Sequence, residues 1–110
     1  IKDSYYEAPE STVSTNELAS GTAIGTNNPP SLTPTWGAAK NLWFAAIMTD
    51  NANITGGPSG YTVETNNTPT AARLAVGYME LEAASEDPST FSGPGGANRV
   101  AMTLAVRPIP

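Results

Sequence analysis

The sequence predicts an all-β fold, an antiparallel β-sandwich preceded by an extended N-terminal arm. Ten glycines and ten prolines break the 110-residue chain into short segments that leave little room for helices. Residues 99–107 alternate between larger aliphatic side chains and small or charged ones, which is typical of a strand with two different faces. Several strand-like segments follow one another with turn residues between them, and this spacing indicates a sandwich.

Residues 1–28 form the predicted arm, and residues 29–110 form the sandwich domain. The arm is polar, and its clearest strand-like stretch is the Thr/Val segment at residues 11–15. Pro29, Pro30 and Pro34 then interrupt any continuing ladder and favour an extended path.

The first strong strand covers residues 41–49, whose nearly continuous apolar character predicts burial on both faces; a helix is the rival reading. A Gly/Pro turn at residues 56–60 precedes a short strand at 61–64, and residues 66–69 form a loop. Residues 72–82 alternate until Gly77, where the apolar phase changes. A bulge or a bend of the strand near Gly77 would explain that change.

The last strand, residues 99–107, has aliphatic side chains on one face and Ala and Thr on the other. The small residues indicate that something packs closely on that second face or that it is lightly solvated. We expect the larger residues of three strands to form the core: Leu42, Phe44, Ile47, Leu74, Val76, Tyr78, Val100, Met102, Leu104 and Val106. Residues 36–107 contain five or six predicted strands, so residues 1–35 or another molecule must complete a closed sandwich.

The composition excludes several classes of function. The chain has no Cys and no His, which rules out Ser-His-Asp and Cys-His catalysis, structural zinc and iron–sulfur ligation. The chain has five basic and ten acidic residues and a net charge of −5, so it lacks the positive charge that binding to nucleic-acid phosphates requires. No apolar run reaches the roughly 18 residues of a membrane span. The sequence therefore predicts a non-enzymatic domain without a cofactor, a nucleic-acid partner or a membrane partner.

Five segments of the chain stand out together: Asn41-Leu42-Trp43-Phe44-Ala45-Ala46-Ile47, Gly57-Pro58-Ser59-Gly60-Tyr61-Thr62, Arg73-Leu74-Ala75-Val76-Gly77-Tyr78, Ala84-Ser85-Glu86-Asp87-Pro88-Ser89-Thr90-Phe91, and Ala101-Met102-Thr103-Leu104-Ala105-Val106-Arg107-Pro108. As a set they resemble a β-sandwich domain found in bacteriophage structural and tail-associated proteins. The resemblance covers residues 29–108 and carries no catalytic signature. It implies a jelly-roll-like sandwich in a phage particle or an extracellular filament, hence a virion or extracellular location.

Candidate chemical sites are few. Glu80 and Glu82 share one face of a strand, where a solvated surface is the better reading than a pair of catalytic carboxylates. Residues 50–53 lack the ladder of oxygen ligands of a calcium loop, so no metal site is expected. Asn53 and Asn66 begin two glycosylation sequons in predicted loops.

Two aromatic side chains, Trp36 and Tyr61, flank loops and are the candidates for stacking on sugar. Trp43 lies inside the most apolar strand, where core packing is the better reading. A carbohydrate-binding module of a phage tail or surface protein is therefore the alternative function, with glycans as the ligands.

The first choice of function is a structural subunit that assembles with copies of itself. The arm has little local reason to fold, and such a segment can complete a neighbour's sheet by strand addition. Exchange of this kind from head to tail does not close, so it builds filaments. The alternative is an arm that folds back on its own domain. The interface candidates are Tyr5, Tyr6, Val13, Leu18 and Ile24.

Overall fold

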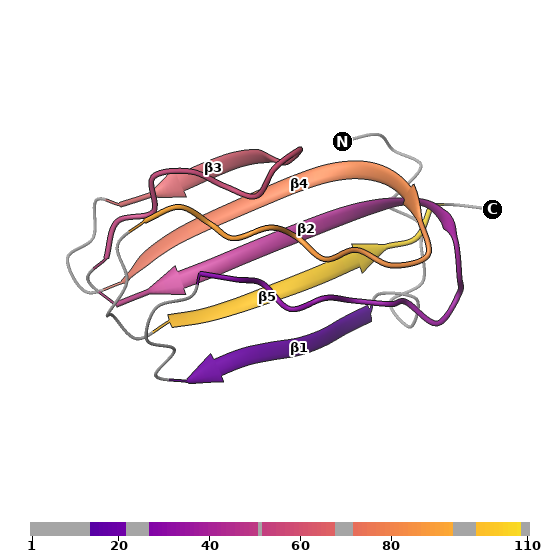
Figure 1. Cartoon of the computed structure of the whole chain (residues 1–110), viewed down its shortest axis with the longest axis horizontal. Helices are drawn as coiled ribbons and strands as arrows, with labels where there is room; N and C mark the ends of the chain where they lie inside the picture. The colour runs from indigo at the N-terminus through magenta and orange to yellow at the C-terminus, as the bar shows by residue number, and fades with distance from the viewer. Residues whose placement is uncertain (1–13, 22–26, 51, 68–71, 94–98, 109–110) are drawn as a thin grey trace.

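The computed structural model describes residues 14–21, 27–50, 52–67, 72–93 and 99–108, and these form five strands and no helix (Figure 1). One antiparallel sheet contains all five in the order β1-β5-β2-β4-β3. The strands are β1 Ser14–Gly21, β2 Ala39–Thr49, β3 Thr62–Asn66, β4 Arg73–Ala83 and β5 Arg99–Val106. The all-β, antiparallel prediction is confirmed, and the helical reading of residues 41–49 is wrong. The described part of the chain has no helix able to cross a membrane.

Strands β2 and β4 pair in one unbroken register over eleven residues, from Ala39 opposite Ala83 to Thr49 opposite Arg73. The bulge expected near Gly77 is therefore absent from this pair, and that prediction is wrong. Gly77 serves another purpose, because a Cβ at this position would lie 3.0 Å from Val63 and 3.1 Å from Tyr61. The missing side chain lets both neighbours pack across β4. A register shift does occur in β1, between Thr15 and Leu18.

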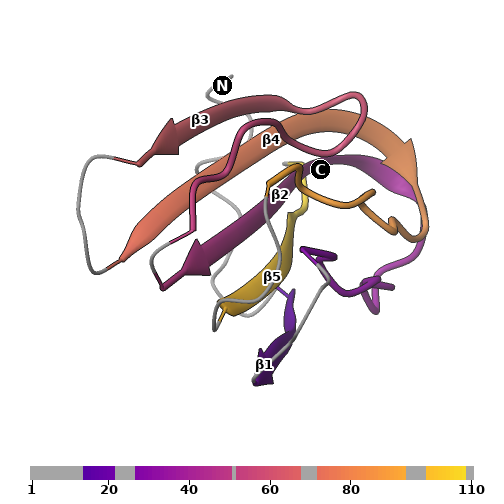
Figure 2. The same ribbon diagram turned by 60° about the vertical axis from the view of Figure 1, so that its left-hand side comes forward.

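One face of the sheet is covered by a layer of extended segments, residues 27–36, 52–60 and 85–92 (Figures 1 and 2). Backbone hydrogen bonds tie these segments together. Leu32 and Glu86 exchange two bonds of 2.9 and 3.0 Å, and the Ser92 carbonyl accepts a bond from Thr55. Two isolated bridges result, and the layer holds no strand among its described residues. A closed sandwich with jelly-roll character stays a prediction.

The core lies between this layer and the sheet. The layer contributes Leu32, Ile54 and Phe91, each about 1% exposed, and β2 contributes the fully buried ring of Trp43. Opposite them the sheet presents mainly small side chains, which allow the layer to approach closely: Ala45, Ala75, Ala101, Thr103 and Ala105.

The core set expected from the sequence is largely wrong. Leu42 and Ile47 are buried, but Leu74, Tyr78 and Val100 are exposed and the other five are half-buried. The alternation of β5 was recognised, yet its small-residue face is the buried one, as the closely packed alternative allowed. The reason is that the covering segments supply the apolar bulk, so the sheet residues facing them must be small.

Candidate assembly surface and ligand pocket

The face of the sheet opposite the covering layer, which we call the outer face, has exposed apolar side chains in register. Met48 is 51% exposed and lies directly opposite Leu74 on β4 and Val100 on β5, which are 41% and 38% exposed. In the next row along β2, Ala46 lies between Val76 and Met102. The small Ala46 side chain leaves a groove of about 150 Å³ with a wholly apolar lining. Contiguous exposed apolar side chains of this kind can mark an interaction site.

Strand β1, residues 14–21 of the predicted arm, forms an edge of the sheet. It pairs with β5 of its own chain, with Leu18 opposite Met102 and Ser20 opposite Val100. These eight residues therefore pair with their own domain, as in the alternative reading. Of the five predicted interface residues only Leu18 lies in the described part; the others are outside it: Tyr5, Tyr6, Val13 and Ile24.

The opposite edge is stepped, because β3 pairs with β4 only as far as Tyr78, whereas β4 continues to Ala83. Charged side chains occupy this open half of β4, with Glu80 and Glu82 both exposed. The indole nitrogen of Trp43 donates a 3.1 Å hydrogen bond to the Leu81 carbonyl, and the Asn41 amide donates one to the Ala83 carbonyl. Charges and side-chain hydrogen bonds of this kind discourage a further strand from pairing at an edge.

The predicted stacking residues, Trp36 and Tyr61, both pack against the buried cluster around Trp43 and are half-buried. The Trp36 indole donates a 3.0 Å hydrogen bond to Asn41, and the Arg107 guanidinium lies 5.9 Å from the centroid of its ring. The Tyr61 hydroxyl is buried and lies near the Glu86 carboxylate. Burial, with a smaller contribution from the negative charge of Glu86, raises the Tyr61 pKa. Both rings are thus partly covered by the protein, and stacking on sugar stays a prediction.

The two predicted glycosylation acceptors lie on different elements. Asn53 is exposed in the covering layer, whereas Asn66 is the last residue of β3 and not a loop residue as expected. Its neighbour Asn67 connects the two places, because its side chain makes hydrogen bonds of 3.0 and 2.8 Å with the backbone N–H and carbonyl of Ile54.

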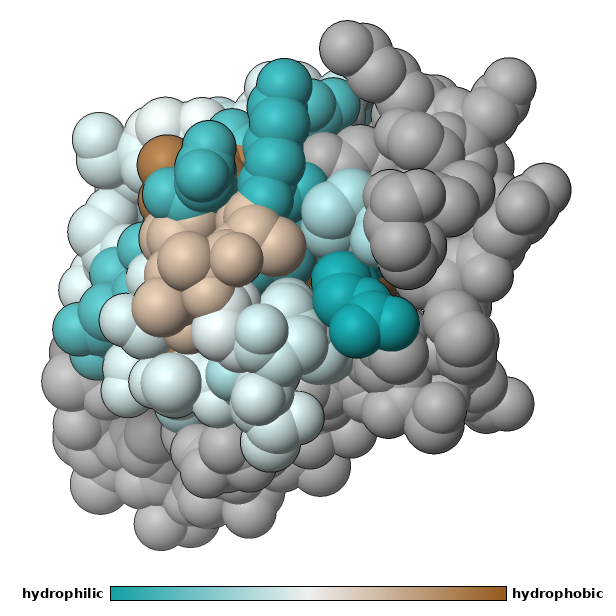
Figure 3. Space-filling view, turned by 90° about the vertical axis from the view of Figure 1, so that its right-hand side faces the viewer, coloured by the Kyte–Doolittle hydropathy of each residue, from teal (hydrophilic) through white to brown (hydrophobic). Residues whose placement is uncertain are grey.

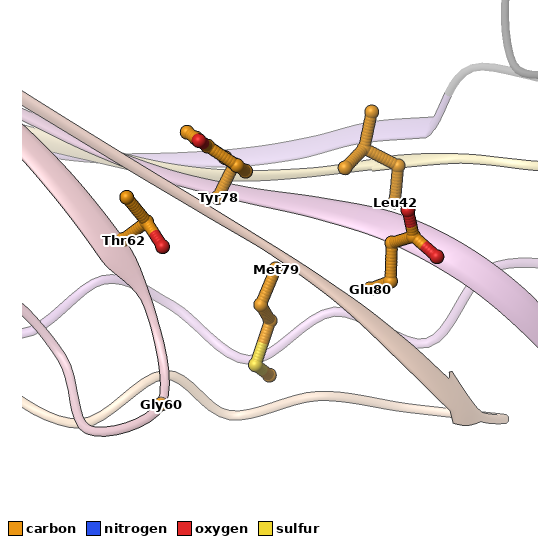
Figure 4. A pocket seen from close by; sticks show the side chains of 6 residues that line it. All are labelled: Leu42, Gly60, Thr62, Tyr78, Met79 and Glu80. Carbon is orange, nitrogen blue, oxygen red and sulfur yellow. The ribbon is translucent and has the colours of Figure 1, made fainter. Parts of the chain in front are cut away.

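A pocket of about 300 Å³ lies beside Thr62, where β3 begins and β4 continues past it. Figure 4 shows Thr62, Tyr78, Glu80 and Leu42 on one side of the sheet with Met79 projecting from the other. Glu80 is paired with Lys40, whose Nζ lies 3.6 Å from a carboxylate oxygen. The sequence could not indicate this pocket, because it depends on where β3 begins.

The end of the molecule where β2 begins and β4 ends is mixed in character. Figure 3 shows hydrophilic side chains around a small patch of weakly hydrophobic ones. Glu80 and Glu82 lie in this half of β4 and are exposed, as a solvated surface requires. No group of three or more metal-binding side chains is found within the described ranges.

Several buried polar residues were not expected from the sequence, and Asn41 is the clearest. It is fully buried in β2, accepting a hydrogen bond from Trp36 and donating one to Ala83. Thr49 and Thr103 donate to the carbonyls of Ala52 and Pro30, which anchors the covering layer to the sheet. The sequence did contain a signal for Asn41 and Thr49. Each is two residues from an apolar residue of the same strand, Trp43 or Ile47, so it shares the buried face with that residue.

Comparisons with protein-family models, curated proteins and solved structures found no match to this chain. The resemblance to phage β-sandwich domains therefore stays a prediction from the sequence.

Proposed function

We propose that the chain is a non-enzymatic structural subunit that assembles with copies of itself. The observation that carries the proposal is the outer face, where Met48, Leu74 and Val100 form an exposed apolar row in register. A sheet with one such face buries it by packing against a second sheet. The best occupant is the outer face of another copy, since two identical apolar faces bring no charge into the row.

The size of this face decides what it can do alone. Three strands spaced about 4.8 Å apart and two rows of side chains about 7 Å apart cover about 200 Å² on each copy. A stable interface commonly buries about 800 Å² on each partner. Face-to-face packing alone therefore gives weak association, and a second interaction is needed for a durable assembly.

Exchange of the N-terminal strand supplies that second interaction in the proposal. A neighbour's arm can make the same ladder with β5 that β1 makes within the chain, with Leu18 opposite Met102. Exchange keeps every strand pairing, so it costs little free energy. When each copy gives its arm to the next copy, the exchange builds an open filament. The open edge of β4 does not compete for the arm, because the charges of Glu80 and Glu82 discourage strand pairing there.

In this proposal the sandwich, and with it the jelly-roll character, is completed between copies. The phage particle or extracellular filament implied by the sequence resemblance is the proposed setting. Carbohydrate binding through Trp36 and Tyr61 is the weaker alternative, because both rings pack into the protein.

Sedimentation velocity over a range of concentrations tests the proposal. The unsubstituted chain should form oligomers, Met48→Lys should weaken them at least 10-fold, and deletion of residues 1–28 should leave at most weak dimers. Ala84→Lys adds the same charge at an exposed residue beyond β4 and should change nothing. Circular dichroism checks that each variant keeps its sheet. An unsubstituted chain that stays monomeric at millimolar concentration would contradict the proposal.

A further inference from the structure

We propose that the pocket at the start of β3 binds one unit of a neutral saccharide. The site lies outside the apolar row of Met48, and it does not depend on self-assembly. Its lining combines an aromatic ring, a carboxylate, a hydroxyl and two apolar side chains with the backbone of a glycine: Tyr78, Glu80, Thr62, Leu42, Met79 and Gly60 (Figure 4).

The register of the strands places these groups. Thr62 and Tyr78 are direct partners on β3 and β4, and Glu80 is the direct partner of Leu42 on β2. Tyr78 and Glu80 are two residues apart on β4, so their side chains leave the same face about 7 Å apart. The four side chains therefore lie on one face of three neighbouring strands, β3, β4 and β2. Because β3 begins at Thr62, no β3 residue lies beside Glu80, and the pocket is open there.

The chemistry of the lining favours a neutral ligand rich in hydroxyl groups. The 36%-exposed Tyr78 ring provides an apolar surface for the C–H face of a sugar. Glu80 accepts hydrogen bonds, and Lys40, 3.6 Å away, places a donor beside that acceptor. Adjacent hydroxyl groups of a sugar are bound well by a hydrogen-bond acceptor and a donor that lie side by side, as Glu80 and Lys40 do. Because Lys40 balances the Glu80 charge, the site does not require a cation, and the net charge of −5 disfavours anions.

A peptide strand is the competing occupant, because the pocket lies along the line of β3. The exposed Glu80 and Glu82 side chains argue against it, because they lie on the stretch of β4 that an added strand would pair with, and charged side chains discourage such pairing at an edge. The pocket volume of about 300 Å³ also matches a small ligand, at the lower end of the range for such sites.

Titration of the ¹⁵N-labelled full chain with glucose, galactose, mannose and N-acetylglucosamine, followed by NMR, tests the site. At least one sugar should shift the amide signals of Gly60, Thr62, Met79 and Glu80, with a dissociation constant of about a millimolar because the ligand has few atoms. The Trp36 indole signal should not move. The same titration of Met48→Lys should give the same constant, so failure of self-assembly and failure of sugar binding are separate results.

Two substitutions change the chemistry of the pocket. Tyr78→Leu removes the ring but keeps an apolar side chain, and Glu80→Gln keeps the shape of the side chain but removes its charge; each should weaken binding at least 10-fold. Absence of shifts with all four sugars, an unchanged constant in both variants, or shifts centred on Trp36 would overturn the proposal. So would binding of a peptide with the sequence of residues 10–21 that perturbs Leu81 and Ala83, because the pocket would then accept a strand.

Discussion

Met48 and Leu74 lie directly opposite each other on β2 and β4, and both side chains are exposed on the outer face. Strands in the middle of a sheet usually bury such residues, and β2 has hydrogen-bonded neighbours on both sides. The covering layer protects the other face, where the side chains are small. One face of the sheet is thus buried under the covering layer, and the outer face is exposed to solvent.

The reversal of the two faces has a direct consequence for stability. Ala105→Leu adds bulk beneath the covering layer, where the side chain is fully buried, and should lower the free energy of unfolding by about 1–3 kcal/mol. Val100→Ala removes bulk from the outer face and should cost under about 1 kcal/mol, since the residue is 38% exposed. Urea unfolding of the monomeric chain measures both. A larger loss of unfolding free energy from Val100→Ala than from Ala105→Leu would instead support the core expected from the sequence.

Asn41 should matter more to stability than its residue type suggests. Replacing it with Leu leaves the Trp36 indole and the Ala83 carbonyl without their partner. We expect a loss of about 2–3 kcal/mol in urea unfolding, because each orphaned buried group costs about 1–3 kcal/mol. Asn53→Leu is the matched control, since Asn53 is exposed in the covering layer. Equal effects of the two substitutions would show that the Asn41 bonds contribute nothing.

Gly57 is required for close packing against β3. A Cβ at this position would lie 2.0 Å from Cγ2 of Val63, so Gly57→Ala should destabilise the fold by about 1–3 kcal/mol. Val63→Ala removes the obstructing methyl groups. In a double-mutant cycle the two changes should couple favourably by about 1 kcal/mol or more. Additive effects in urea unfolding would mean that the turn relieves the clash by moving.

Stability should decline in alkali because of Tyr61. Burial raises the pKa of its hydroxyl above the value of the unfolded chain, so the folded state favours the protonated form. This contribution is complete below a pH of about 10 and is lost as the pH rises further. Tyr61→Phe should flatten the fall in the free energy of unfolding. An alkaline profile identical to that of the unsubstituted chain would exclude Tyr61 as the cause.

The positions of β2 to β5 could be predicted because Gly, Pro and Asn mark the turns between them. Strand β1 could not, because the segment expected to form it was residues 11–15 and the strand covers residues 14–21. The buried face could not be predicted either, since the residues that cover it, Leu32, Ile54 and Phe91, lie in segments without any periodic pattern. Trp36 and Tyr61 show a related limit: their places beside loops gave no sign that both rings pack partly against the cluster around Trp43. The pocket beside Glu80 depends on the length of β3, which no single residue encodes.

A single cysteine on the outer face tests the central claim most directly, because the chain has no cysteine of its own. Met48→Cys should give a covalent dimer with a short bismaleimide cross-linker, and Ala84→Cys, exposed beyond the end of β4, should give little at the same concentration. This result would place outer face against outer face in solution. Equal cross-linking of the two variants, or none through position 48, would contradict the proposed assembly.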